Sequence, residues 1–165
     1  MKHSARTVAT LGLCTAIAMV LAWLESQLPP LAVAVPGIKL GLPNIAIIFI
    51  LYRFGWKEAA GVSFVRIVAV SLLFGNVPTL LYSLAGGFLS LLGMTLLKKT
   101  NLLSTVGVSV AGGVLHNVGQ ILMAMLIMST AGLGYYLIVL CVTGIVSGVF
   151  VGLCGSFAVK RIRIR

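Results

Sequence analysis

Six apolar segments dominate this sequence and limit what it can fold into. Each is a nearly continuous hydrophobic run, and short polar, glycine-rich or proline-rich breaks separate one run from the next. A helix needs about 20 apolar residues to cross the hydrocarbon core of a bilayer, so a chain of 165 residues has room for about six crossings. The runs cover residues 7–24, 41–52, 59–74, 79–97, 104–128 and 134–158.

Helices explain these runs better than β-strands do. The segment NIAIIFILY, residues 44–52, shows none of the apolar and polar alternation that strands of a membrane barrel require. The composition, 60% hydrophobic and 8% charged, leaves too little polar surface to cover a soluble globule. We therefore predict an all-α integral membrane protein, with one transmembrane domain over residues 1–165 that forms a six-helix bundle.

The basic residues predict how this bundle is oriented. Ten of the twelve lysines and arginines fall in segments that share one side of the membrane if the chain crosses six times. The positive-inside rule then places both termini in the cytoplasm. A basic rim facing anionic lipids explains the net charge of +10, so we expect a lipid bilayer and no nucleic acid as the partner. These ten residues are Lys2, Arg6, Arg53, Lys57, Lys98, Lys99, Lys160, Arg161, Arg163 and Arg165.

The residues that most enzymes use are scarce in this chain. Glu25 and Glu58 are its two carboxylates, so paired-carboxylate catalysis and the Asp-rich magnesium chemistry of a prenyl synthase lack their residues. There is no glycine-rich phosphate loop with its lysine. The three cysteines are widely spaced within apolar runs, which is typical of small buried side chains and not of metal ligands. We predict a protein that is not an enzyme and that has no catalytic residues and no metal site.

The chain is irregular where it should be crossing the membrane. The stretch LPPLAVAVPGIKLGLPN, residues 28–44, holds four prolines and two glycines but is too apolar for a free external loop. Non-helical backbone is tolerated at membrane depth where it is buried in protein or lines a cavity. We therefore predict a cavity beneath this segment, open toward the outer face, with Lys39 above it and Pro43 in the first turn of the next helix.

Polar residues inside the apolar runs suggest what this cavity binds. Arg66, His116, Asn117 and Gln120 lie near the centres of their runs, where such groups are expensive unless they face the bundle interior. Arg66 has no acidic partner in any of the apolar runs, and Lys39 has at most Glu25, so we expect a ligand with an acidic group. The predicted ligand-binding residues are Lys39, Asn44, Arg66, Tyr82, Ser83, Gly86, Gly87, His116, Asn117 and Gln120.

Each of these residues also has a purely structural interpretation. Arg66 could extend toward an interface, and the polar residues of the fifth run could form hydrogen bonds between helices. The small residues near Gly86 could serve helix packing. Lys39 could pair with Glu25 or be solvated, and Tyr82 could belong to an interfacial aromatic belt.

Small residues recur along the first apolar run. Ala5, Ala9, Gly12 and Ala16 follow one face, and Ala18 with Ala22 repeats the spacing on another. Such patterns allow close helix contact. They predict either docking of a partner helix or packing within the bundle itself.

Three motifs resemble a known family. PGIKLGLPNI (36–45), SLAGGFLSLLGM (83–94) and GGVLHNVGQILMA (112–124) are similar to the bacterial family called Gx transporter or heptaprenyl diphosphate synthase component I. The predicted architecture resembles the substrate-binding S components of energy-coupling factor (ECF) transporters. That resemblance implies a location in the bacterial cytoplasmic membrane, a lid at residues 29–41, and docking of a coupling subunit at Ala5, Ala9, Ala18 and Ala22.

Two functions follow from the resemblance. The first is an S-component-like subunit that binds a small acidic or amphipathic ligand from the outer face and relies on a coupling subunit and ATPases. The second is a membrane subunit that holds a quinone, flavin or prenyl lipid for a partner in extracellular electron transfer or isoprenoid synthesis, without transport. A bound flavin, quinone or prenyl group is the cofactor-like ligand that the resemblance implies.

Overall fold

The computed structural model describes residues 5–27 and 41–162, and most of these residues are helical, with no strand among them. The prediction of an all-α fold is confirmed. Every predicted apolar run corresponds to one helix, and a short 3-10 helix precedes the last. The elements are α1 (Ala5–Ser26), α2 (Asn44–Arg53), α3 (Trp56–Phe74), α4 (Val77–Thr100), α5 (Thr105–Met128), η1 (Ala131–Tyr136) and α6 (Leu137–Arg161).

Among the described residues, four helical segments are long and apolar enough to cross a membrane, which supports an integral membrane protein. They are α1, α4, α5 and the segment Gly132–Arg161 that contains α6. The helix α3 has 19 residues but carries Lys57, Glu58 and Arg66. With 10 residues, α2 extends about 15 Å, half the thickness of the hydrocarbon core. Six complete crossings and the cytoplasmic location of the termini stay predictions.

Local capping explains where the long helices begin and end. The side chain of Asn76 accepts a hydrogen bond of 2.9 Å from the backbone N–H of Thr79 at the start of α4, and Pro78 follows within the first turn. Ser104 caps α5 in the same way. Asn101, at the end of α4, has a φ of +56°, a left-handed conformation that often ends a helix.

The short helix α2 forms the buried centre of the bundle. All six residues from Ala46 to Leu51 are buried, which fits a helix that is hydrophobic on every side. It packs against α1, α3 and α6. Residues of α1, α3, α4 and α5, among them Cys14, Val62, Met94 and Val108, complete the same core.

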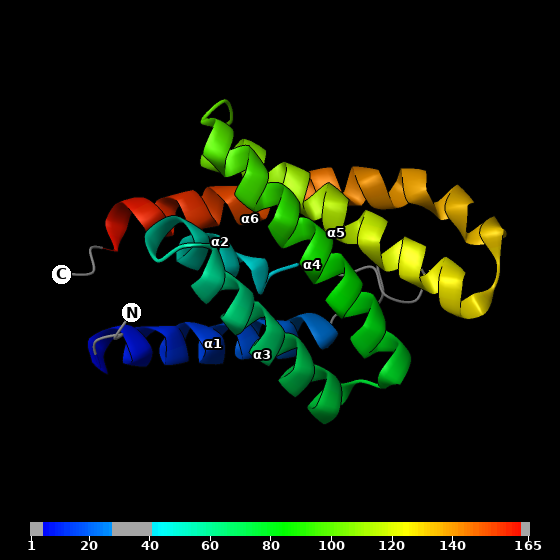
Figure 1. Cartoon of the computed structure of the whole chain (residues 1–165), viewed down its shortest axis with the longest axis horizontal. Helices are drawn as coiled ribbons and strands as arrows, with labels where there is room; N and C mark the ends of the chain where they lie inside the picture. Colours follow the sequence, from blue (N-terminus) through cyan, green and yellow to red (C-terminus); the bar gives the residue numbers. More distant parts are fainter. Residues whose placement is uncertain (1–4, 28–40, 163–165) are drawn as a thin grey trace.

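Basic side chains hold one end of this assembly. Lys98 of α4 donates to the backbone oxygen of Leu51 at 2.6 Å, and Arg53 donates to the backbone oxygens of Val159 and Ile162. Cations favour helix C-termini because the exposed carbonyls carry partial negative charge. The start of α1 and the end of α6 lie at this same end of the bundle (Figure 1). Several cations predicted to form a basic rim are thus located together.

Glycines bring α5 and α6 close together. A Cβ added at Gly148 would lie 2.6 Å from the Cα of Val110, and one at Gly152 would lie 2.8 Å from the Cα of Val106. These helices contact each other through small residues at four-residue spacing, as membrane helices commonly do. This packing seam was not among the sequence predictions.

Candidate functional site

Two small cavities meet at the N-terminal end of α2. The larger, here called the Arg66 cavity, has a volume of about 70 Å³. Residues of α1, α3, α4 and α5 line it together with the chain that enters α2. Its polar lining includes Glu25, Asn44, Arg66, Ser71, Ser83 and His116.

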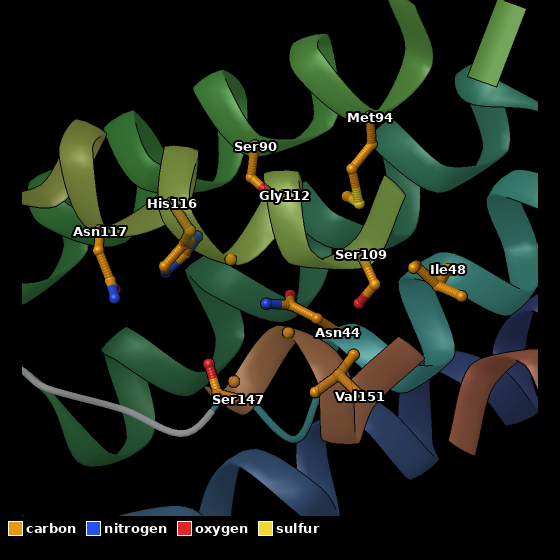
Figure 2. A pocket seen from close by; sticks show the side chains of 13 residues that line it. Asn44, Ile48, Ser90, Met94, Ser109, Gly112, His116, Asn117, Ser147 and Val151 are labelled. Atoms are coloured by element: carbon orange, nitrogen blue, oxygen red, sulfur yellow. The ribbon is translucent and has the colours of Figure 1, made fainter. Parts of the chain in front are cut away.

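The smaller space, here called the inner cavity, lies deeper between α2, α4, α5 and α6. Its volume is about 20 Å³, enough for one or two water molecules. Figure 2 shows the polar side chains around it. Asn44 and His116 line both cavities, so the two spaces are neighbours along one polar track. The polar residues of the inner cavity are Asn44, Ser90, Ser109, His116, Asn117 and Ser147.

Arg66 points inward. Its side chain is 9% exposed and lines the Arg66 cavity, so it does not extend toward an interface, and that alternative interpretation is wrong. Its Nε atom has no hydrogen-bond partner among the described residues. A buried donor of this kind is expensive unless something accepts from it.

Glu25 lies in the same cavity and corrects a prediction. We expected no acidic residue near Arg66, but Glu25 is 7% exposed, and its negative charge acts on the guanidinium of Arg66. Its Oε1 accepts a hydrogen bond of 2.5 Å from the backbone N–H of Gly41. Burying either charge alone would be costly, so their proximity helps to keep both inside the bundle. Glu25 also links the end of α1 to the approach to α2.

The backbone at Gly41 and Pro43 directs the start of α2 toward this cavity. Gly41 has a φ of +75°, a conformation that glycine adopts without strain. A Cβ there would also lie 3.0 Å from the Nδ2 of Asn44. Pro43 has helical angles immediately before the helix, and Asn44 donates from its backbone to the oxygen of Gly41. The positive end of the helix dipole therefore lies beside Arg66 and favours an anion.

The polar residues of α5 do not all reach one space. His116 lines both cavities. Asn117 is buried, lines the inner cavity and donates from Nδ2 to the backbone oxygen of Leu140 at 2.6 Å, so it forms the hydrogen bond between helices that we considered as an alternative. Gln120 lines neither cavity. The prediction that it shares a cavity with Arg66 is wrong, because its Cγ lies where α4 crosses closely at Gly86.

The predicted ligand-binding residues of α4 also do not all line one cavity. Ser83 lines the Arg66 cavity, whereas half-buried Tyr82 lines neither cavity. A Cβ at Gly86 would lie 2.7 Å from the backbone oxygen of His116, and one at Gly87 would lie 2.8 Å from the Cδ1 of Ile67. Gly86 packs against α5 and Gly87 against α3, so helix packing accounts for both glycines. Neither lines the Arg66 cavity.

Two other predictions concern α1 and the segment that follows it. Lys39 and residues 29–40 of the predicted lid lie outside the described residues. Ala5 and Ala9 are exposed, as are Gly12 and Ala16. Ala18 and Ala22 are buried in the bundle. They pack internally and cannot contact a partner from this position, so docking remains a prediction for Ala5 and Ala9.

Several serines that were not among the predicted ligand-binding residues line the cavities. Ser71, Ser90, Ser109 and Ser147 line one cavity or the other. For Ser109 a signal was available, because it precedes His116 by seven residues, two helical turns on the same face. Among the described residues, no three His, Cys, Asp or Glu side chains are grouped as a metal site would require.

Comparison with known proteins identifies the family. No curated protein and no solved structure matches the chain. Residues 14–158, which include every cavity residue named above, match the family described as heptaprenyl diphosphate synthase component I. The match covers far more than half of the sequence and agrees with the family resemblance of the three motifs. The protein belongs to the heptaprenyl diphosphate synthase component I family.

Proposed function

We propose that this protein is a non-catalytic membrane subunit that binds the anionic head of a prenyl lipid in the Arg66 cavity and presents it to a synthase partner. The observation that carries the proposal is the buried guanidinium of Arg66, whose Nε lacks a hydrogen-bond partner within the described residues. The family name supports a partner in isoprenoid synthesis.

The electrostatics of the cavity favour an anionic group. Arg66 and the N-terminal end of α2 both contribute positive potential, and Glu25 contributes the opposing charge. Hydrogen bonds to a charged group contribute roughly 1.5–3 kcal/mol. Asn44, Ser83 and His116 offer further polar atoms around the same space. We infer that a phosphate or carboxylate accepts hydrogen bonds from Arg66 in this cavity.

The chemistry of the chain supports a binding role and not a catalytic one. Prenyl synthases hold diphosphate through magnesium and clustered carboxylates, whereas this sequence has two carboxylates in total. Glu25 lies in the Arg66 cavity and Glu58 in the first turn of α3. We infer that a partner supplies the catalytic residues.

The size of the cavity favours a prenyl head over a flavin or a quinone ring. Pockets that hold drug-sized ligands usually measure about 300–1,000 Å³, and the Arg66 cavity measures about 70 Å³. A small anionic head fits such a space more readily than a fused ring system.

A second candidate is an S-component-like transport subunit. The exposed face of Ala5, Ala9, Gly12 and Ala16 favours it, because a coupling helix could approach α1 closely there. A Cβ at Gly12 would meet nothing within 4 Å. Purification of the tagged protein from its own membrane distinguishes the two. A prenyl synthase subunit as the partner supports the first candidate, and a coupling subunit with ATPases supports the second.

Direct binding tests the proposal. Dimethylallyl diphosphate serves as a probe with a short tail, and the protein is held in nanodiscs of phosphatidylcholine. The paired variant Arg66→Gln with Glu25→Gln removes both charges together, which avoids leaving either one buried alone. We expect its dissociation constant to rise at least ~10-fold, as loss of one charge-assisted hydrogen bond implies.

Lys57→Gln is the matched control, because Lys57 is an exposed cation on the same helix. It should bind the probe as the wild type does. Equal affinity of the paired variant and the wild type, or no binding to either, would refute the proposal.

A further inference from the structure

A third space, which is apolar, opens between α3 and α4. It has a volume of about 360 Å³. The exposed rings of Phe64 (59% exposed) and Phe88 (71% exposed) form part of its two sides. The groove residues are Ala60, Ser63, Phe64 and Ile67 of α3 with Leu84, Gly87, Phe88 and Leu91 of α4. We call this space the α3–α4 groove.

The groove lies next to the Arg66 cavity along the same pair of helices. On α3, residues up to Ile67 line the groove, and residues from Arg66 to Phe74 line the cavity. On α4, Thr79 and Ser83 line the cavity, and the next two turns line the groove. Ile67 lines both spaces. The space between α3 and α4 is therefore lined by polar residues along one half and by apolar residues along the other.

Gly87 permits this arrangement. The Cδ1 of Ile67 lies 2.8 Å from where a Cβ of Gly87 would be, so the isoleucine packs directly onto the backbone of α4. With a larger residue at position 87, Ile67 would have to move. Ile67 is thus the residue that the cavity and the groove share.

We propose that the α3–α4 groove holds the first part of the hydrocarbon tail of a single-chain lipid whose anionic head occupies the Arg66 cavity. This inference rests on the proposed function and specifies its ligand. From Ile67 to Ala60 the groove follows about 10 Å of α3 at 1.5 Å per residue. The remainder of a longer tail would lie in the bilayer.

The observations favour one chain and a small head. The cavity of about 70 Å³ is small for a phosphate together with a glycerol backbone. Arg66 and Ile67 both line the cavity, and Ile67 also lines the groove, so a head bound to the guanidinium would have its tail next to the groove. Charge at one end and an apolar groove at the other complement an amphipathic anion such as a prenyl phosphate or diphosphate.

The test compares two chain lengths on variants that change the groove alone. Farnesyl diphosphate and dimethylallyl diphosphate share a head and differ in tail length. Ala60→Phe places a ring at the far end of the groove. We expect it to weaken binding of farnesyl diphosphate at least ~5-fold and to leave dimethylallyl diphosphate unchanged. Val65→Phe adds the same ring on the exposed, lipid-facing surface of α3 and should change neither affinity.

A second variant covers the case in which Ala60→Phe fails to fold. Phe88→Ala removes one side of the groove at an exposed position, and Leu92→Ala is its control on the same helix outside the groove. We expect Phe88→Ala to weaken the farnesyl probe selectively. Competition with phosphatidylglycerol tests whether an ordinary two-chain lipid occupies the groove, and we expect it not to displace the farnesyl probe.

The outcomes separate this inference from the proposed function. If the paired Arg66 and Glu25 variant loses the short probe while groove variants bind both probes normally, the groove proposal is wrong and the head site stands. Displacement by phosphatidylglycerol also overturns the groove proposal. If neither probe binds the wild type, the proposed function itself fails.

Discussion

At the scale of single residues, the free-energy cost of burying a polar group predicts which residues line the cavities better than their spacing along the sequence does. Arg66 and His116 could be predicted to face the interior, because a polar group in an apolar helix seeks the protein and not the lipid. The same argument predicts that Gln120 faces the cavity. Gln120 instead lies against Gly86, because α4 approaches α5 closely there. The role of Glu25 could not be predicted, because only tertiary folding brings the end of α1 beside α3.

Glu25→Gln tests how these two charges work together. The change keeps an oxygen for the N–H of Gly41 but removes the charge that acts on Arg66. We expect the free energy of unfolding to fall by about 3 kcal/mol, as for other buried pairs that lose one partner. Affinity for dimethylallyl diphosphate should rise, because Arg66 then interacts with the probe alone.

Unfolding in a denaturing detergent series and probe binding measure the two effects. Glu58→Gln is the control, since Glu58 lies outside the cavity. Unchanged or weaker probe binding by Glu25→Gln would show that Glu25 does not compete with an anion.

At the scale of helices, hydrophobic runs and capping residues account for most of the fold. Sequence alone located each helix to within a few residues, because a helix that spans a membrane must be apolar over most of its length. It did not identify the contact between α5 and α6 at Gly148 and Gly152. A glycine in one helix indicates close packing, but the sequence does not say which helix approaches it.

Lys98→Met tests how α2 is held. The ammonium of Lys98 donates to the backbone oxygen of Leu51 and lies 4.9 Å from the ring centre of Tyr52. Loss of this C-terminal interaction should reduce the free energy of unfolding by about 1–2 kcal/mol. Lys99→Met removes an adjacent exposed cation and should have little effect on the same unfolding curve. An equal fall in the free energy of unfolding in both variants would show that the effect comes from the loss of a positive charge and not from the hydrogen bond of Lys98 to Leu51.

At the scale of the whole molecule, the bundle places a short buried helix at its centre and polar cavities at the N-terminal end of that helix. This arrangement explains why so apolar a chain retains buried Arg66 and Glu25. The sequence predicted a cavity here from the irregular stretch before α2. It could not predict that Ile67 lines both this cavity and the α3–α4 groove, because that depends on how Ile67 packs onto Gly87.

Cysteine labelling tests the predicted orientation. With Cys14, Cys141 and Cys154 replaced by alanine, Leu102→Cys places a thiol between α4 and α5, and Gly132→Cys places one between α5 and α6. The basic residues predict that position 102 faces the cytoplasm and position 132 the outside. A membrane-impermeant thiol reagent added to intact cells should label position 132 alone. Labelling of position 102 alone would show that the orientation is opposite to the predicted one.

The most direct test of the head site measures contact between a bound anion and Arg66. Solid-state NMR of the protein with ¹⁵N-labelled arginine side chains and farnesyl diphosphate reports the distance between phosphorus and guanidinium nitrogen. We predict a distance of about 4 Å, as a charge-assisted hydrogen bond requires, and loss of that signal in Arg66→Lys. No contact with any arginine, or a signal that persists in Arg66→Lys, would contradict an anion site at Arg66.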